Sequence, residues 1–189
     1  MTRYLAALLA LFLGLVAIGG AAASGAKKPP GKPGKDTATY EFLVGANSAG
    51  FALCSVPVPN PCPDVARAAN GDTVRIAGTG TLTVHPKSVT GTGTYTSTNA
   101  RVGSGTWTAV QLLSFKAYAT NPSVTAGATS GKALIRLQLS NGSTAVLRIT
   151  CDLPLTTIPS GFHEGVRLAV QGGPNFNKEA GGVTLFIRH

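Results

Sequence analysis

Strand-forming side chains alternate with small or polar ones from residue 37 to the end of the chain, and this alternation limits the fold more than any other feature. Threonine, valine and aromatic residues recur with the two-residue period of a strand, not with the 3.6-residue period of a helix. Six such stretches cover residues 39–44, 72–84, 87–98, 104–119, 166–170 and 183–188. Together with one hairpin near residue 141, they predict a single all-β domain of about eight antiparallel strands.

The hairpin can be assigned a register. A two-residue loop at Asn141-Gly142 would point the apolar residues of 133–139 and 145–151 to opposite faces. A three-residue loop at 140–142 pairs Ile135 with Leu147, keeps both apolar sets on one face, and places Gly142 at the left-handed position. We therefore expect the three-residue turn, with Cys151 on the core side. The opposite face then carries Lys132, Arg136 and Arg148.

Threonine occupies every second position in much of residues 79–108, and glycines accompany it. Long strands that contain glycine bend sharply or close on themselves, so the pattern favours a β-barrel over a β-sandwich. One short helix is expected near residues 63–70, because proline and aspartate stand at its start and Asn70-Gly71 at its end.

Residues 1–23 have the features of a secretory signal peptide. Arg3 precedes an apolar run from Leu5 to Ile18, and the small residues that follow end in an Ala-x-Ala sequence at Ala23. An uncleaved membrane anchor is the alternative, but the Gly- and Ala-rich second half suits a bilayer core poorly. We expect cleavage near Ser24, no membrane span afterwards, and a secreted protein that is extracellular or in the cell envelope.

Residues 24–36 predict a basic linker in front of the β-domain at 37–189. Four lysines alternate there with proline and glycine, and they supply nearly half of the formal net charge of +9. Such a segment is expected to be extended and solvated, and to be attracted to anionic polymers or lipids. In the β-domain the basic residues are scattered and lack interleaved aromatic partners, so no nucleic-acid partner is expected there.

Three cysteines in an exported chain allow one disulfide. Cys54 and Cys62 are the expected pair, because the proline-rich segment between them is extended and turn-forming. A bond from either of them to Cys151 is the alternative. Their spacing does not match a zinc site.

His163-Glu164 is the pair that most resembles catalytic machinery. The glycines on either side, Gly161 and Gly165, would allow both side chains to turn into one cleft, whereas neighbouring residues on a regular strand face opposite ways. No metal site is expected, because the three histidines have no metal-ligand spacing. No cofactor is expected either, because the Gly-x-Gly pairs lie inside strands and not before a helix.

Candidate ligand-binding residues are aromatic side chains on long strands and amides in a long loop. An internal pocket or a loop site would use Tyr95, Trp107, Tyr118, Asn175 and Asn177. The regular threonines could instead form a flat contact face, and Asn141 is a glycosylation acceptor if the host is eukaryotic.

These features favour a secreted, non-enzymatic β-domain that binds a glycan, a cell-envelope polymer or a small apolar molecule. A small barrel enzyme of lyase or isomerase type is the first alternative, using His163 with Glu164 or Glu179 beside an internal pocket. A structural surface protein with a threonine-rich contact face is the second.

Overall fold

The computed structural model describes residues 37–189, which form one antiparallel sheet of 11 strands and a single short 3-10 helix. The predicted all-β domain is confirmed. The predicted signal peptide (1–23) and linker (24–36) lie outside the described residues. No helix within 37–189 has the length and hydropathy needed to cross a bilayer.

The elements are β1 (Thr39–Val44), η1 (Leu53–Ser55), β2 (Asp64–Arg67), β3 (Thr73–Thr83), β4 (Ser88–Ser97), β5 (Ser104–Thr120), β6 (Ala128–Leu139), β7 (Thr144–Cys151), β8 (Gly165–Val170), β9 (Asn175–Phe176), β10 (Lys178–Gly181) and β11 (Thr184–Arg188).

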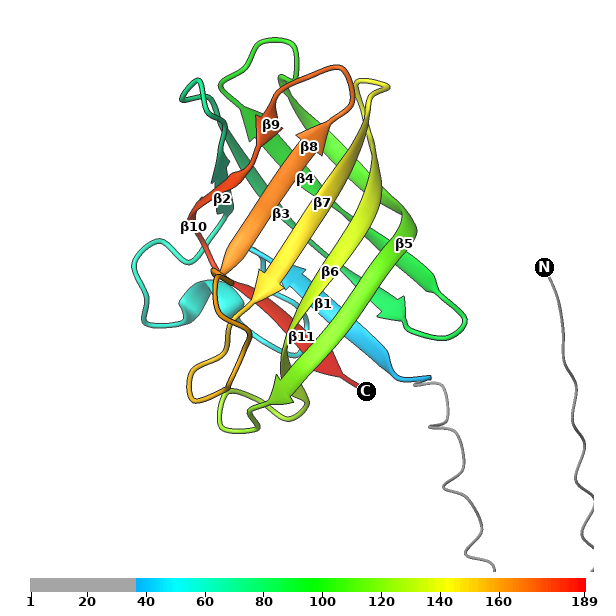
Figure 1. The fold of residues 1–189 in the computed structure, drawn as a ribbon, viewed down its shortest axis with the longest axis vertical. Helices are drawn as coiled ribbons and strands as arrows, with labels where there is room; N and C mark the ends of the chain where they lie inside the picture. The colour runs from blue at the N-terminus through cyan, green and yellow to red at the C-terminus, as the bar shows by residue number, and fades with distance from the viewer. Residues whose placement is uncertain (1–36) are drawn as a thin grey trace, which may run out of the picture. The chain divides into compact units, whose positions relative to one another are not determined.

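Six strands pair edge to edge in a closed circuit, in the order β3, β4, β5, β6, β11, β1 and back to β3. Two long strands pair with more than one neighbour on the same edge. The first residues of β3 pair with β2 and its later residues with β1, while β6 pairs first with β11 and then with β7. β7, β8 and β9 therefore extend the sheet from β6, and β2 and β10 extend it from β3 (Figure 1).

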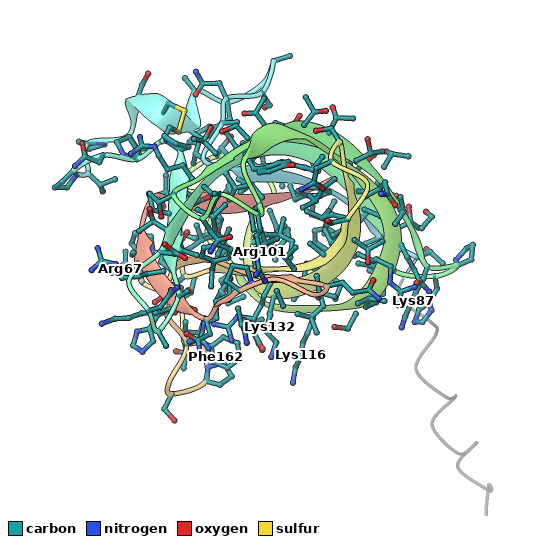
Figure 2. All side chains as sticks on the ribbon, turned by 90° about the horizontal axis from the view of Figure 1, so that it is seen from above. Arg67, Lys87, Arg101, Lys116, Lys132 and Phe162 are labelled. Atoms are coloured by element: carbon teal, nitrogen blue, oxygen red, sulfur yellow. A yellow bond between two sulfur atoms is a disulfide. The ribbon has the colours of Figure 1, made fainter. Side chains whose placement is uncertain are left out.

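Two large aromatic side chains pack on a glycine-lined surface inside this circuit. Trp107 and Phe42 are almost fully buried, and the indole N–H of Trp107 donates to the Ala77 carbonyl at 3.2 Å. A Cβ at Gly93 would lie 2.6 Å from the Trp107 ring, and one at Gly80 would lie 2.5 Å from Phe42. The glycines thus provide the space that these rings fill, and the strands curve around the packed side chains (Figure 2).

The threonines take the opposite face of the same two strands. Because side chains alternate along a strand, glycine inside requires the intervening residues to point outward. Thr92 and Thr94 are exposed, and the hydroxyls of Thr81 and Thr90 are 2.8 Å apart across the β3–β4 pair. The alternation of threonine and glycine in β3 and β4 is therefore a consequence of the packing of Trp107 and Phe42 on the inner face. Contact of this face with an ordered surface stays a prediction.

The predicted turn at residues 140–142 is confirmed. Ile135 pairs with Leu147, and Gly142 has a φ of 87°, in the left-handed region. Cys151 is buried on the core side, as expected.

The predicted helix at 63–70 is wrong, because residues 64–67 form β2. This strand pairs with β3 along one edge and with β10 along the other, so its backbone groups have partners on both sides. Asp64 and Ala66 point inward and are completely buried. The local helix signals are weaker than these two long-range pairings. The structure has more than the eight strands expected because β2, β9 and β10 were not predicted.

Gly93→Ala tests the packing of Trp107. The new Cβ would lie 2.0 Å from the Ala77 carbonyl oxygen and 2.6 Å from the indole ring, so we expect the free energy of unfolding to fall by about 1–3 kcal/mol in urea titrations. Gly50→Ala is the matched control, because nothing lies within 4 Å of its Cβ, and it should change stability by less than about 0.5 kcal/mol. Equal effects of the two substitutions would contradict this account of the glycines.

Candidate functional site

One loop of the domain is closed by a disulfide bond. The loop joins β1 to β2, and the predicted Cys54–Cys62 bond is present within it. Cys151 is a buried free thiol, so the alternative pairings through it are not formed. Burial raises the pKa of this thiol well above its ordinary value, which keeps it protonated and unreactive.

Beneath this loop lies a cavity of about 500 Å³, which we call the end pocket. Apolar side chains from four separate segments form most of its lining, and its polar lining consists of Asp152, Glu164 and Thr184. The apolar lining residues are Phe51, Leu53, Val56, Pro57, Val58, Val124, Leu153, Pro154, Val183 and Leu185. A concave apolar site with a few converging polar groups is the usual form of a small-molecule pocket.

Glu164 joins three segments at the end pocket. Its Oε1 accepts hydrogen bonds from the backbone N–H of Thr184 at 2.6 Å and lies 2.8 Å from the Thr184 hydroxyl. Its Oε2 accepts a hydrogen bond from the backbone N–H of Asp152. The carboxyl therefore ties the start of β8 to the end of β7 and the start of β11.

A hydrogen bond donated by the Thr184 hydroxyl to the Glu164 carboxylate favours the ionised form of Glu164. The Thr184 hydroxyl has one hydrogen but lies 2.8 Å from two oxygens, the Thr150 carbonyl and Glu164 Oε1. If the carbonyl accepts that hydrogen instead, only a proton on Glu164 can complete the second hydrogen bond. Desolvation opposes the hydrogen bonds that favour the ionised form: it outweighs the backbone hydrogen bonds from Asp152 and Thr184 and that from the hydroxyl of Thr184, and raises the pKa of Glu164 to about 7.

Asp64 is a second carboxyl near Glu164, and it is more deeply buried than Glu164. It is completely buried, and neither of its oxygens has a hydrogen-bond partner of normal geometry among the described residues. Burial raises the pKa of Asp64 well above its ordinary value, and the negative charge of Glu164 raises it further. A Cβ at Gly182 would lie 2.2 Å from Asp64 Oδ1, so only glycine fits there without displacing the carboxyl.

Side chains, not backbone pairing, connect β8 to the β2–β10 pair, and we call this boundary the seam (Figure 1). Glu179 of β10 accepts from the Arg167 Nε of β8 at 2.8 Å and also contacts Arg148 of β7. Burial alone would raise the pKa of Glu179. The hydrogen bond from Arg167 and the charges of both arginines outweigh burial and hold that pKa below its usual value.

His163 and Glu164 line a second, polar pocket of about 470 Å³ beside the seam, together with Arg167, Lys178 and Glu179. The His163 side chain is exposed, and no hydrogen bond joins it to Glu164 among the described residues. Glu164 bonds to Thr184 and Asp152 instead. A catalytic role for His163 stays a prediction.

The other predicted ligand residues lie in three separate places. Tyr95 and Trp107 are in the core, and the Tyr95 hydroxyl is buried without a hydrogen-bond partner in the described part of the chain. Tyr118 lies on β5, partly exposed, and Asn175 and Asn177 are exposed at β9 and just after it. The structure therefore does not bring these five residues into one site, and their roles in binding stay predictions.

Asp64, Asp152 and Thr184 were missed by sequence reasoning. Asp64 resembles the first-turn acid of a helix, and Thr184 is one of many threonines in strand-like sequence. Long-range pairings place Asp64 and Thr184 near Glu164: β2 pairs with β3 and β10, and β11 pairs with β1 and β6. Residues 37–189 hold no group of three or more His, Cys, Asp or Glu side chains arranged to bind a metal ion.

The two raised carboxyl pKa values predict that stability falls with rising pH. A group whose folded pKa exceeds its unfolded value stabilises the fold when protonated, and this contribution is lost as the pH rises through the folded pKa. For Glu164, with a pKa of about 7, the loss between about pH 4.5 and 7 is on the order of 3 kcal/mol. Asp64 contributes a fall of the same sign, because its folded pKa also lies above its ordinary value.

Urea titrations across this pH range measure the effect. Glu164→Gln should flatten the fall below pH 7, and Asp64→Asn should flatten it where Asp64 ionises. The folded pKa of Glu179 lies below its usual value, so its contribution to the pH dependence of stability has the opposite sign. This contribution is lost only as the pH falls into the acidic range. An unchanged pH slope in both variants would show that these carboxyls are not the cause.

Comparisons of the chain with family models, with curated proteins and with solved structures find no match. What the domain does is therefore argued from its own side chains.

Proposed function

We propose that the domain binds a small, largely apolar molecule that carries one protonated amine, and that it does so in the end pocket. The observation that supports this most is the Glu164 carboxyl, which lines a mostly apolar cavity with no Lys or Arg in the lining. An apolar pocket with an ionisable group of shifted pKa is typical of ligand sites.

The local charge favours an amine over an anion. Residues 37–189 carry eleven Lys and Arg against six Asp and Glu, yet Asp152 and Glu164 both line the end pocket, and Asp64 interacts electrostatically with Glu164. A buried carboxylate without a cation is costly. A ligand ammonium would supply the missing countercharge, while its apolar body would replace water against the lining.

The loop that forms one wall is held in place before any ligand arrives. The Cys54–Cys62 bond closes the segment that carries Val56, Pro57 and Val58. The backbone N–H of Cys54 also donates to the Asn47 side chain at 2.7 Å. Because a pre-ordered wall loses little conformational entropy on binding, this bond supports a binding function for the pocket.

Octylamine and octanol form a matched pair of probes for calorimetric titration. We expect octylamine to bind roughly tenfold more tightly at pH 8 than at pH 6, because Glu164 becomes ionised over this interval. Octanol should show no such pH dependence. Glu164→Gln should weaken octylamine binding by more than roughly thirtyfold and remove the pH dependence.

Two tryptophan substitutions separate the pocket from the surface. Val58→Trp should obstruct the end pocket and reduce the binding of both probes, because Val58 is 43% exposed and lines the cavity. Leu155→Trp is the control, because Leu155 is 98% exposed and is not part of the lining. Equal affinity for octylamine and octanol, or unchanged binding in Glu164→Gln, would contradict the proposal.

A further inference from the structure

Four side chains form a continuous cluster on the outer face of the sheet, and none of them lines the end pocket. Lys116 and Tyr118 lie on β5, Lys132 lies on β6, and Phe162 lies in the loop before β8. The Tyr118 and Phe162 rings meet edge to face, with centroids 5.4 Å apart. Lys116 Nζ is 5.5 Å from the Tyr118 centroid, and Lys132 Nζ is 4.9 Å from that of Phe162. We call this the cation–aromatic cluster.

Figure 2 shows Lys116, Lys132 and Phe162 together on the outside of the curved sheet. Arg67 and Lys87 lie on other sides of the molecule in the same view. The cluster is therefore a local concentration of charge and not part of a uniformly basic surface.

The two lysines are direct cross-strand neighbours, and neither has an acidic partner. Lys116 pairs with Lys132 in the β5–β6 register, a position where like charges destabilise a sheet. Within residues 37–189, neither lysine forms a salt bridge. By contrast, the two arginines on β7 and β8 share the carboxylate of Glu179. A bound anion would reduce the electrostatic repulsion between these two lysines.

The aromatic rings add an apolar contact beside these charges. Tyr118 and Phe162 are only partly buried, although both lie on a face that is otherwise mostly polar. A flat, partly exposed ring offers a surface on which the C–H face of a sugar ring can pack. Charge and ring together therefore fit a sugar that carries an anionic group.

The basic surface continues along β6 beyond the cluster. Arg136 is exposed and lies on the same face as Lys132, four residues further on, which corresponds to roughly 13 Å along a strand. A single small anion does not span that distance, whereas an extended polymer does.

From these contacts we infer that the cation–aromatic cluster, with Arg136, binds an acidic polysaccharide carrying carboxylate or sulfate groups. The two rings stand nearly perpendicular, at 82°, and touch, so they do not offer parallel platforms for successive nucleic-acid bases. The large exposed apolar side chains of the described residues, which are Val58, Val110 and Leu155, are not members of the cluster, which favours a polymer over a membrane as its partner.

Affinity electrophoresis of the full chain in gels that contain polygalacturonate, dextran sulfate or neutral dextran tests this inference. We expect retardation by at least one of the two acidic polymers and none by dextran. Lys116→Gln with Lys132→Gln should weaken binding by about tenfold. Tyr118→Ala, which leaves the charge unchanged, should weaken it as well.

The matched control is Lys87→Gln with Arg101→Gln, which removes the same charge elsewhere on the surface. Equal losses in the two double variants would show a response to net charge alone and would overturn the inference. Absence of retardation by both acidic polymers would also overturn it. Single-stranded DNA and anionic phospholipid vesicles are tested in parallel, and a stronger, cluster-dependent interaction with either would assign the surface to that partner instead.

Discussion

The packing of Trp107 and Phe42 against the glycine-lined β3–β4 pair is the contact on which the rest of the fold depends. Each ring lies over its cross-strand partner, because Trp107 of β5 pairs with Gly93 of β4 and Phe42 of β1 pairs with Gly80 of β3. Their large apolar surface is thereby removed from water. The outward threonines, the strand curvature and the inner glycines of β3 and β4 are consistent with this arrangement.

Acidic and basic side chains of the domain lie in different places. Carboxyls gather at the seam and the end pocket, where Asp64 and Glu164 are held in surroundings that favour their neutral forms. Unpaired cations stand on the outer face, where Lys116 and Lys132 are neighbours. The segment between β7 and β8 contributes to both places, because Phe162 belongs to the cation–aromatic cluster and Glu164 lines the end pocket. Two ligands of opposite charge could therefore occupy the domain together.

Local patterns predicted those parts of the structure whose outcome depends on near neighbours. The turn at 140–142 follows from apolar alternation on both sides and one glycine, and the Cys54–Cys62 bond follows from a short, proline-rich loop. The predicted helix at 63–70 was wrong because strands distant in sequence decide the structure of this segment. Its proline, aspartate and Asn-Gly signals are local, but β3 and β10 supply partners that are distant in sequence. His163-Glu164 was identified as a pair, although the contacts of Glu164 are with Thr184 and Asp152.

The sequence by itself determined that this chain forms antiparallel strands, where one hairpin turns, and which side of that hairpin faces the core, because side-chain alternation sets these features within a few residues. Only the tertiary structure decided that Asp64 is buried near Glu164, that an apolar pocket lies under the disulfide loop, and that two lysines stand side by side. Each of these depends on which strands become neighbours when the circuit closes, and pairings between distant segments are not encoded in any single stretch of the chain.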